Sequence, residues 1–340
     1  MSDLNINNIT DRTGDSGPVI AGVSTVSSGQ FVVPVGPTEY RGGRGRGVFS
    51  GGDNPVTTTM DYIDISSTGN AADFGDNIDV GWGISGGVAS LTRGTFASGY
   101  NASGTFFKTI QYTTISSQGG VSNFGDLSVV SYRPGGASNS IRGLYAGHWT
   151  TAWATVNNIE YITIATTGDA SDFGDLIGSL PANKGGAASP TRALFPGGNS
   201  PYTSIIDYVE IATRGDSKDF GDITSSRSEI AGCSSSTRAV FGGGVINPTQ
   251  TNIIEYNTFA TLGNSIDFGD LTLLRRALAA TSNGTRGVFG GGFNGSPVND
   301  AVNIIDYVTI ASTGNATDFG DLSIVKRDHG AVSDSHGGLG

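Results

Sequence analysis

The sequence predicts an all-β fold, a six-bladed propeller of four-stranded blades, and three observations carry this prediction. An (Asp/Glu/Gln)-Tyr pair followed by Phe-Gly-Asp recurs six times, and a motif Arg-(Gly/Ala)-x-aromatic precedes each copy. The copies follow one another at intervals of 47 to 51 residues, a period typical of a propeller or solenoid array. The interval between tyrosine and phenylalanine never changes. The tyrosines are Tyr62, Tyr112, Tyr161, Tyr208, Tyr256 and Tyr307, and the phenylalanines are Phe74, Phe124, Phe173, Phe220, Phe268 and Phe319.

The composition agrees with short strands and tight turns. Of 340 residues, 54 are glycine and only 14% are charged, which disfavours a helix-rich fold. The net charge of -11 argues against a nucleic-acid partner, because phosphate binding requires clustered positive charge. The single cysteine, Cys233, excludes an intramolecular disulfide and is expected to be a small core residue. No signal-peptide leader and no apolar run of about 18 residues occur, so neither export nor membrane insertion is expected.

Residues 1–41 stand outside the repeats and are expected to form an extended or β anchoring segment. Two β-prone runs, residues 19–26 and 30–35, predict a hairpin or two extended strands. Because a lone two-stranded unit is marginally stable in water, it should pack on the propeller, on a copy of itself or on another protein. The Gly/Arg run at 42–47 could indicate RNA binding, but Arg46 simply begins the first repeat, and we favour that structural interpretation.

Within residues 42–340, each repeat predicts four short strands. The first begins in a small, hydroxyl-rich stretch such as 231–235, and the second, 237–242, ends in glycines. The third, such as 205–211, is apolar on both faces, as expected for a strand between neighbouring blades. The fourth surrounds Phe-Gly-Asp, and the Thr-x-Gly-(Asn/Asp/Gly) before it suits a tight hairpin.

The two ends of the array predict how the ring closes. The first repeat begins at its second strand, at Arg46, whereas residues 329–335 form a spare first strand after the last repeat. The C-terminal strand is therefore expected to complete the first blade. Residues 336–339 look like the degenerate start of a seventh copy, with His336 at the arginine position.

This order of strands resembles a kelch-type propeller repeat over about residues 42–340, with Phe-Gly-Asp where a tryptophan is usual in that family. The repeat Ile-Asp-Tyr-x-x-Ile-x-Thr-x-Gly-Asn-x-x-Asp-Phe-Gly-Asp-Leu is similar to repeats in predicted virion proteins of marine tailed phages, including cyanophages. The leader, Ile9 to Gly14 through residues 31–34, is similar to the start of such proteins. The resemblance implies a virion protein made in the host cytoplasm.

The acidic residue before the repeated tyrosine lies on a largely apolar strand and requires a partner. We expect the repeated arginines to supply it, because a guanidinium can bind a carboxylate through two hydrogen bonds. Six equivalent catalytic sites are implausible, so these pairs are expected to be structural. The acidic residues are Asp61, Glu160, Asp207, Glu255 and Asp306, with Gln111 as the exception, and the arginines are Arg46, Arg93, Arg142, Arg192, Arg238 and Arg286.

The Asp-Phe-Gly-Asp motif has two alternative interpretations. The kinase magnesium motif is excluded because its companion motifs are absent and six copies exist. Asp169, Asp172 and Asp175 could approach a calcium loop, since hard cations bind several oxygens, but the spacing matches no EF-hand. We favour Asp172 and Asp175 as acceptors for backbone N–H groups at the turn, and leave calcium as the alternative.

No catalytic or metal-binding constellation is predicted. The three histidines, His148, His329 and His336, have no metal-ligand spacing, and no Ser-His-Asp or nucleophile-elbow pattern occurs. The sequence therefore predicts a protein that is not an enzyme and has no cofactor.

The second-to-third connections differ in every repeat, whereas the third-to-fourth turns have constant length. In a four-stranded blade the second-to-third and fourth-to-first connections lie on one face, so one face should be regular and the other irregular. Loops on a rigid scaffold commonly carry binding sites. The candidates for stacking on sugars or docking a protein are Tyr100, Trp149, Trp153, Tyr202 and Phe293. The alternative is that these loops fill the mouth of the channel.

Together these observations predict a non-enzymatic phage virion component, a tail-fibre or appendage protein that presents its variable loops for host-surface attachment. The expected partners are other virion proteins, bound through residues 1–41, and a host surface glycan or protein. The β-prone leader is compatible with a homo-oligomer such as a trimer. The alternatives are a purely structural decoration of the capsid or tail and a bacterial carbohydrate-binding propeller.

Overall fold

In a computed structural model of the chain, the described residues are 24–25, 31–32, 45–78, 86–101, 103–152, 154–177, 185–295 and 300–339. The chain divides into two compact units, Met1–Arg44 and Gly45–Gly340. In the first unit, β1 (Ser24–Thr25) pairs antiparallel with β2 (Phe31–Val32), which confirms a hairpin between the two β-prone runs. The rest of the expected anchor, residues 1–41, lies outside the described residues.

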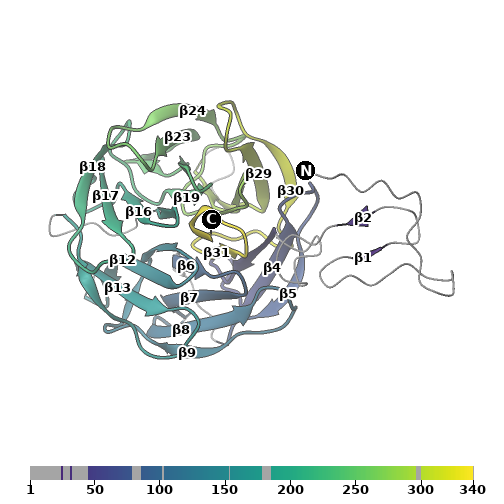
Figure 1. The fold of residues 1–340 in the computed structure, drawn as a ribbon, viewed down its shortest axis with the longest axis horizontal. Helices are drawn as coiled ribbons and strands as arrows, with labels where there is room; N and C mark the ends of the chain where they lie inside the picture. Colours follow the sequence, from purple (N-terminus) through teal and green to yellow (C-terminus); the bar gives the residue numbers. More distant parts are fainter. Residues whose placement is uncertain are drawn as a thin grey trace, which may run out of the picture. The chain divides into compact units, whose positions relative to one another are not determined.

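The second unit is a six-bladed β-propeller, as predicted, with six four-stranded antiparallel sheets around a central axis (Figure 1). From the axis outwards, the strands of blades 1 to 3 are β31 (Gly330–Ser333), β3 (Arg46–Ser50), β4 (Thr59–Asp64) and β5 (Ala72–Asp76); β6 (Gly86–Ala89), β7 (Arg93–Tyr100), β8 (Phe106–Thr114) and β9 (Ser122–Asp126); and β11 (Gly135–Ser138), β12 (Arg142–Thr150), β13 (Thr155–Thr163) and β14 (Ser171–Asp175).

The strands of blades 4 to 6, in the same order, are β15 (Ala187–Ala188), β16 (Arg192–Pro196), β17 (Ile205–Glu210) and β18 (Lys218–Asp222); β19 (Ala231–Ser234), β20 (Arg238–Gly242), β23 (Ile253–Thr258) and β24 (Ile266–Asp270); and β25 (Ala279–Ser282), β26 (Arg286–Gly290), β29 (Ile304–Thr309) and β30 (Thr317–Asp321). Short additional strands are β10 (Ser131–Tyr132), β21 (Val245–Ile246), β22 (Thr249–Gln250), β27 (Phe293–Asn294) and β28 (Asp300–Ala301).

The C-terminal strand closes the ring, as predicted. β31 pairs with β3, with Val332 opposite Val48, and the Asp334 carboxylate accepts a hydrogen bond of 2.8 Å from the N–H of Gly45. Closing one blade with strands from both ends of the array joins the first and last repeats into one sheet.

The tail after β31 does not begin a seventh repeat, contrary to the prediction. Gly337–Leu339 form a 3₁₀ turn, η2, and His336 Nε2 donates a hydrogen bond of 3.0 Å to the carbonyl oxygen of Ala89 in blade 2. A Cβ on Gly338 would lie 1.8 Å from the carbonyl oxygen of Ser138 in blade 3. The tail therefore packs against the innermost strands, because β3 already has a partner on each side and offers no edge for another strand.

Backbone contact between blades explains the small residues of the innermost strands. A Cβ on Gly87 would lie 2.2 Å from the carbonyl oxygen of Ala331, one on Gly136 2.6 Å from that of Gly87, and one on Gly186 2.0 Å from that of Gly136. No side chain fits at these positions, since Cβ contacts below about 3 Å do not occur in close-packed interiors.

The hydrophobic core consists of clusters between successive blades rather than a single centre. Between blades 1 and 2, for example, Val48, Met60 and Phe74 pack with Phe96 and Ile115. Both faces of a blade are thus covered, which accounts for the apolar character of both faces of the third strand. Among the described residues, no helix is long and apolar enough to cross a membrane.

We predict that Gly186→Ala destabilises the propeller strongly. The added methyl group would overlap the backbone of Gly136 and force two blades apart, so we expect a loss of about 2–4 kcal/mol in the free energy of unfolding. Gly284→Ala is the matched control, because a Cβ there meets nothing within 4 Å. Equal urea midpoints for the two variants would contradict the close approach of the innermost strands.

Candidate functional site

The repeated arginines do not pair with the repeated carboxylates, so the predicted pairs are wrong. The strand register separates them: Arg46 lies opposite Asp64, whereas Asp61 lies opposite Phe49. Three residues along a strand correspond to about 10 Å. Each arginine instead stacks on the tyrosine of its own blade, with 4.2 to 5.3 Å between guanidinium carbon and ring centre: Arg46 on Tyr62, Arg93 on Tyr112, Arg142 on Tyr161, Arg192 on Tyr208, Arg238 on Tyr256 and Arg286 on Tyr307.

Each of these arginines also donates a hydrogen bond to the following blade. Arg142 Nη1, for example, lies 2.7 Å from the carbonyl oxygen of Ile211, and the other five make the corresponding bond to Ile115, Ile164, Phe259, Ile310 and Ile65. The arginines therefore join successive blades on the face that carries the first-to-second and third-to-fourth turns, which we call the regular face.

Each repeated carboxylate accepts a hydrogen bond from the fourth-to-first connection that leads from the preceding blade into its own blade. Glu160 accepts a hydrogen bond of 2.7 Å from the N–H of Ser128, and Asp207 accepts one of 2.8 Å from Ile177. The Gln111 amide oxygen accepts the equivalent bond of 3.0 Å from Ile78. An acceptor oxygen is all that this position requires, which explains why glutamine can replace a carboxylate here.

Among the described residues, three of these carboxylates also form ion pairs inside the protein. Arg227 lies 2.6 Å from Glu255, Arg275 lies 2.7 Å from Asp306, and Lys326 lies 2.7 Å from Asp61, and all six side chains are fully buried. Burial lowers the pKa of Lys326, and the Asp61 carboxylate opposes that shift. Sequence reasoning missed these cations. The available signal was a basic residue five positions after Phe-Gly-Asp in three of the six copies.

The acidic turns at the outer rim also connect blades. Asp169 accepts a hydrogen bond of 2.9 Å from the N–H of Asp126 in the preceding blade, and Asp216 does the same for Asp175 at 3.0 Å. The residue after the turn glycine makes this contact between blades. That Asp172 and Asp175 accept hydrogen bonds from backbone N–H groups at the turn stays a prediction; in blade 4 the counterpart of Asp172, Asp219, accepts one of 3.0 Å from the N–H of Gly221. Asp172 and Asp175 are exposed.

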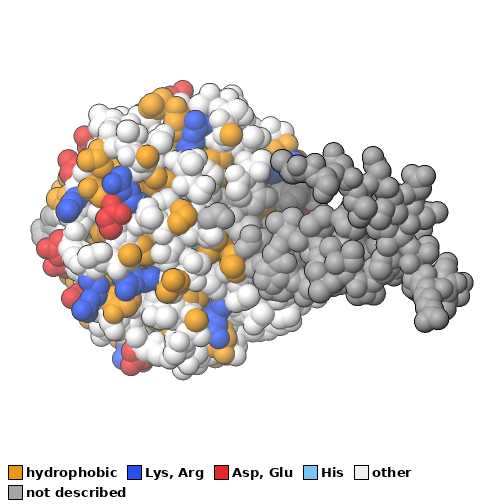
Figure 2. Space-filling model, viewed as in Figure 1, with side chains coloured by type: hydrophobic (Ala, Val, Ile, Leu, Met, Phe, Trp, Pro, Cys, Tyr) orange, Lys and Arg blue, Asp and Glu red, His pale blue; other side chains and the backbone are white. Residues whose placement is uncertain are grey.

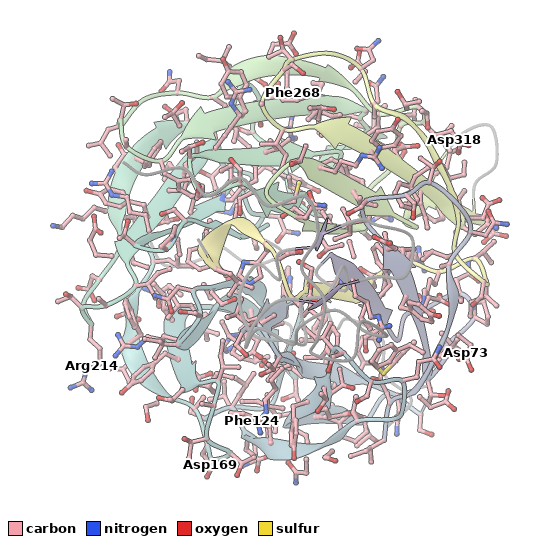
Figure 3. The ribbon with its side chains drawn as sticks, turned by 45° about the vertical axis from the view of Figure 1, so that its right-hand side comes forward. Asp73, Phe124, Asp169, Arg214, Phe268 and Asp318 are labelled. Carbon is pink, nitrogen blue, oxygen red and sulfur yellow. The ribbon has the colours of Figure 1, made fainter. Side chains whose placement is uncertain are left out.

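The acidic turns of the six blades do not gather at one place. Figure 3 shows Asp73, Asp169 and Asp318 spaced around the outer edge of the disc. Among the described residues, no group of three or more His, Cys, Asp or Glu side chains could hold a metal ion. On the face seen in Figure 2, basic and acidic side chains are spread around the ring without a basic patch.

The face opposite the regular face carries the second-to-third and fourth-to-first connections, and we call it the irregular face. Blades 2 and 3 differ most there: β7 and β12 have eight and nine residues, whereas β3, β16, β20 and β26 have five. The longer strands continue past a bulge at the point where other blades end in two glycines. At about 3.3 Å per residue, this adds about 10 Å of hairpin.

These hairpins bring four aromatic residues together, Tyr100, Phe106, Tyr132 and Trp149, which we call the aromatic platform. Tyr100 stacks on Phe106 with ring centres 4.9 Å apart, and both contact Tyr132 at 5.4 Å. Tyr132 in turn stacks on Trp149 at 6.4 Å. Tyr132 is buried beneath the other three, which are partly exposed.

The structure thus unites two of the five aromatic candidates, Tyr100 and Trp149. Phe293 lies between the guanidinium groups of Arg276 and Arg327, at 5.0 and 4.9 Å. Tyr202 lies in the connection of blade 4, outside the platform, and Trp153 lies outside the described residues. Sequence reasoning missed Phe106 and Tyr132, whose only signal is an aromatic residue near a connection of variable length.

Ion pairs link the connections just before the innermost strands. Arg133 contacts Glu229 at 3.3 Å and Asp328 at 2.5 Å, and Arg276 contacts Glu229 at 2.6 Å. The backbone N–H of Asp328 donates to Ala277, and that of Ala277 donates to Glu229. These contacts tie the fourth-to-first connections of four blades to one another, and the first of them also carries Tyr132 of the aromatic platform.

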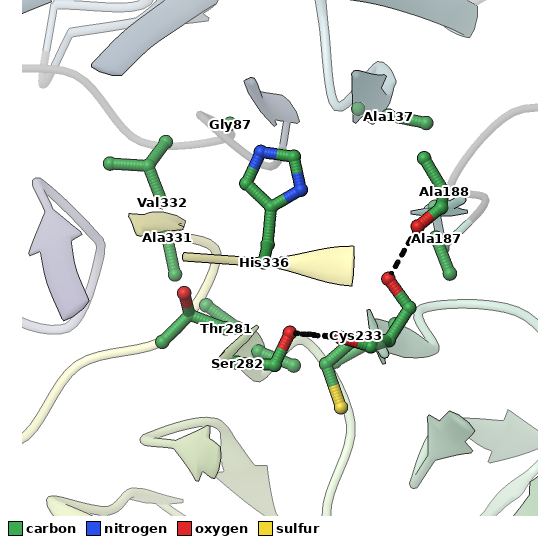
Figure 4. Close-up of a pocket in the computed structure, with 18 of the residues that line it drawn as sticks. Gly87, Ala137, Ala187, Ala188, Cys233, Thr281, Ser282, Ala331, Val332 and His336 are labelled. Carbon is green, nitrogen blue, oxygen red and sulfur yellow. Dashed lines mark hydrogen bonds between the residues drawn. The ribbon is translucent and has the colours of Figure 1, made fainter. Parts of the chain in front are cut away.

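The channel itself contains a small cavity of about 90 Å³, lined by Gly, Ala and Ser residues of the innermost strands, with His336 among them (Figure 4). Cys233 on this lining is buried, as expected, and burial raises the pKa of its thiol. A thiol that stays protonated is a poor nucleophile. Burial lowers the pKa of His336 to about 4, so the imidazole is neutral at pH 7.

His148 lies in β12, next to Trp149 in the sequence. It is fully buried, and neither ring nitrogen has a hydrogen-bond partner. Burial lowers its pKa to about 4 and raises that of Glu160 in the neighbouring strand β13.

No family of known proteins matches this sequence, and no match is found among curated proteins.

We predict that Lys326→Met costs about 3–5 kcal/mol of unfolding free energy, because it leaves the buried Asp61 carboxylate without its cation. Lys108→Met is the matched control, since the pair of Lys108 with Asp126 is solvent-exposed and such pairs contribute about 0–1 kcal/mol. Chemical denaturation of both variants measures the difference. Equal losses would show that the buried pair stabilises no more than a surface pair.

His148 should make the stability of the protein depend on pH. Its folded pKa of about 4 lies below the ordinary value of 6.5, so the unfolded chain binds the proton first and stability falls as pH drops from about 6.5 to 4. His148→Gln removes this contribution. We expect the stability difference between wild type and variant to shift by about 3 kcal/mol between pH 7 and pH 4. Parallel pH profiles of the thermal midpoint would refute a buried neutral imidazole.

Proposed function

We propose that this protein is a non-enzymatic component of a phage virion, a tail-fibre or appendage protein whose irregular face attaches to the host surface. The repeat and leader resemble virion proteins of marine tailed phages, which supports the virion assignment. One structural observation supports attachment: two hairpins extend beyond the scaffold on a single face and carry an aromatic platform.

The chemistry of the described residues supports a binding role. The repeated charged side chains are engaged in contacts between blades, and Cys233, His148 and His329 are buried. A rigid ring with aromatic side chains on projecting hairpins suits recognition, because little conformational freedom is lost on binding.

Residues 1–41 are proposed to anchor the protein to another virion protein. Their β-prone runs contain the hairpin of β1 and β2, and a two-stranded unit requires a packing partner for stability. Docking this segment into the particle would leave the propeller to face outwards.

A second candidate is a structural decoration of the capsid or tail, docked through the irregular face. Exposed aliphatic side chains favour it: Ile78, Val129, Ile177 and Val325 follow Phe-Gly-Asp in four blades and are 55%, 38%, 37% and 39% exposed. Apolar side chains on connections of several blades suit a contact with protein.

Electron microscopy of the assembled particle tests the proposal and separates the two candidates. We expect residues 1–41 to be buried in another virion protein and the hairpin tips of blades 2 and 3 to face solvent. If the irregular face is itself covered by shell or tail protein, the propeller is a building block. Absence of the protein from purified particles would refute the virion role.

A further inference from the structure

The hairpin tips of blades 2 and 3 carry no net charge. Residues 98–106 and 148–155 contain no Asp, Glu, Lys or Arg, and burial keeps His148 neutral. The nearest basic side chains are already paired: Arg133 with Glu229 and Asp328, and Lys108 with Asp126. With a net charge of -11 on the chain, this surface offers nothing to attract an anionic ligand.

The apolar surface of the tips consists of flat rings. Tyr100, Phe106 and Trp149 are the only large apolar side chains of the described tip residues, and each is partly exposed. Aromatic rings offer a flat apolar surface with polar edges, which matches the C–H face of a sugar ring. The exposed aliphatic residues that suit a protein contact, such as Ile78 and Val325, lie outside the tips.

Polar uncharged groups surround the rings. Ser103, Thr105 and Thr151 are exposed, and Thr150 is partly exposed. Their hydroxyl groups can both donate and accept hydrogen bonds, as can the hydroxyl groups of a sugar. Stacking rings beside uncharged hydroxyl groups therefore match a neutral carbohydrate.

The tips are held in place before any ligand binds. The Asn101 side chain accepts hydrogen bonds from the N–H groups of Ser103 and Thr105, at 3.0 and 2.9 Å, and the N–H of Thr150 donates to Ala154 at 2.8 Å. Below them, Arg133 lies 5.8 Å from the Tyr132 ring centre and is fixed by its two carboxylates. Preorganisation of this kind reduces the entropic cost of binding.

We infer that the aromatic platform binds the terminal ring of a neutral glycan, with Trp149 and Phe106 stacking on its C–H face and the tip hydroxyl groups bonding its edge. This inference rests on the proposed attachment function and names the ligand class and the site.

The test is binding of the full-length protein to an array of neutral oligosaccharides that end in glucose, galactose or N-acetylglucosamine, with carboxylated and sulfated counterparts beside them. We expect binding to at least one neutral glycan, with an affinity that does not change between low and high salt, because no charges are involved. Trp149→Ala and Phe106→Ala should each weaken it by about tenfold or more, and Trp149→Phe should restore part of the loss.

Tyr202→Ala is the aromatic control on the irregular face. The control on the regular face is Ile141→Ala, because Ile141 lies in a first-to-second turn and is 66% exposed. Both should bind as the wild type does, and all variants should keep its thermal midpoint. Binding to anionic glycans alone, binding to none of the neutral glycans, or equal losses in Tyr202→Ala would overturn the inference.

The virion role is tested separately by microscopy of the particle. A protein that is found in particles but binds no neutral glycan overturns only the ligand assignment. Binding of neutral glycan by a protein absent from particles overturns the virion role and leaves a carbohydrate-binding propeller.

Discussion

The close approach of neighbouring backbones at the axis is the constraint on which the rest of the propeller depends. At Gly87, Gly136 and Gly186 the innermost strands of successive blades leave no room for a Cβ. Once the blades meet this closely at the axis, their outer parts must fill a widening wedge, and the aromatic clusters between blades do so. Ring closure through β31 then makes every blade a neighbour of two others.

The repeated polar residues also hold neighbouring blades together, at a greater distance from the propeller axis. Arginines bridge to the next blade on the regular face, and carboxylates, or Gln111 in blade 2, hold the connections of the irregular face. The Asn or Asp after the turn glycine caps the rim in five blades, whereas blade 2 has Gly120 at that place. Five of the six seams are thereby fixed at three places. This leaves the second-to-third connections under little structural constraint, and these are the segments that vary in length.

The ring is uneven around its circumference. The three buried ion pairs link consecutive blades, from blade 4 to blade 1, whereas the long hairpins and the aromatic platform occupy blades 2 and 3. In blade 3, Ser131 stands at the sequence position that the cation has for blades 5, 6 and 1, and among the described residues no buried cation pairs with the carboxylate of Glu160. Among the described residues, the two blades that project the aromatic platform contain no such buried ion pair.

The sequence by itself determined the number of blades, the four-strand unit, the closing strand and the contrast between the two faces. These features follow from the period of the repeat and from the alternation of apolar residues, and both are local patterns in the sequence.

Only the tertiary structure decided which charged side chains meet. Arg46 and Asp61 have counterparts together in five of the six copies but lie at different heights on neighbouring strands, and the cation for Asp61, Lys326, comes from the far end of the chain. The aromatic platform could not be predicted from the linear sequence either, since Tyr132 approaches Tyr100 and Phe106 only when two blades stand side by side. Contacts between blades depend on the distance of each residue from the propeller axis and on the register of neighbouring strands. The spacing of residues within a single repeat determines neither quantity.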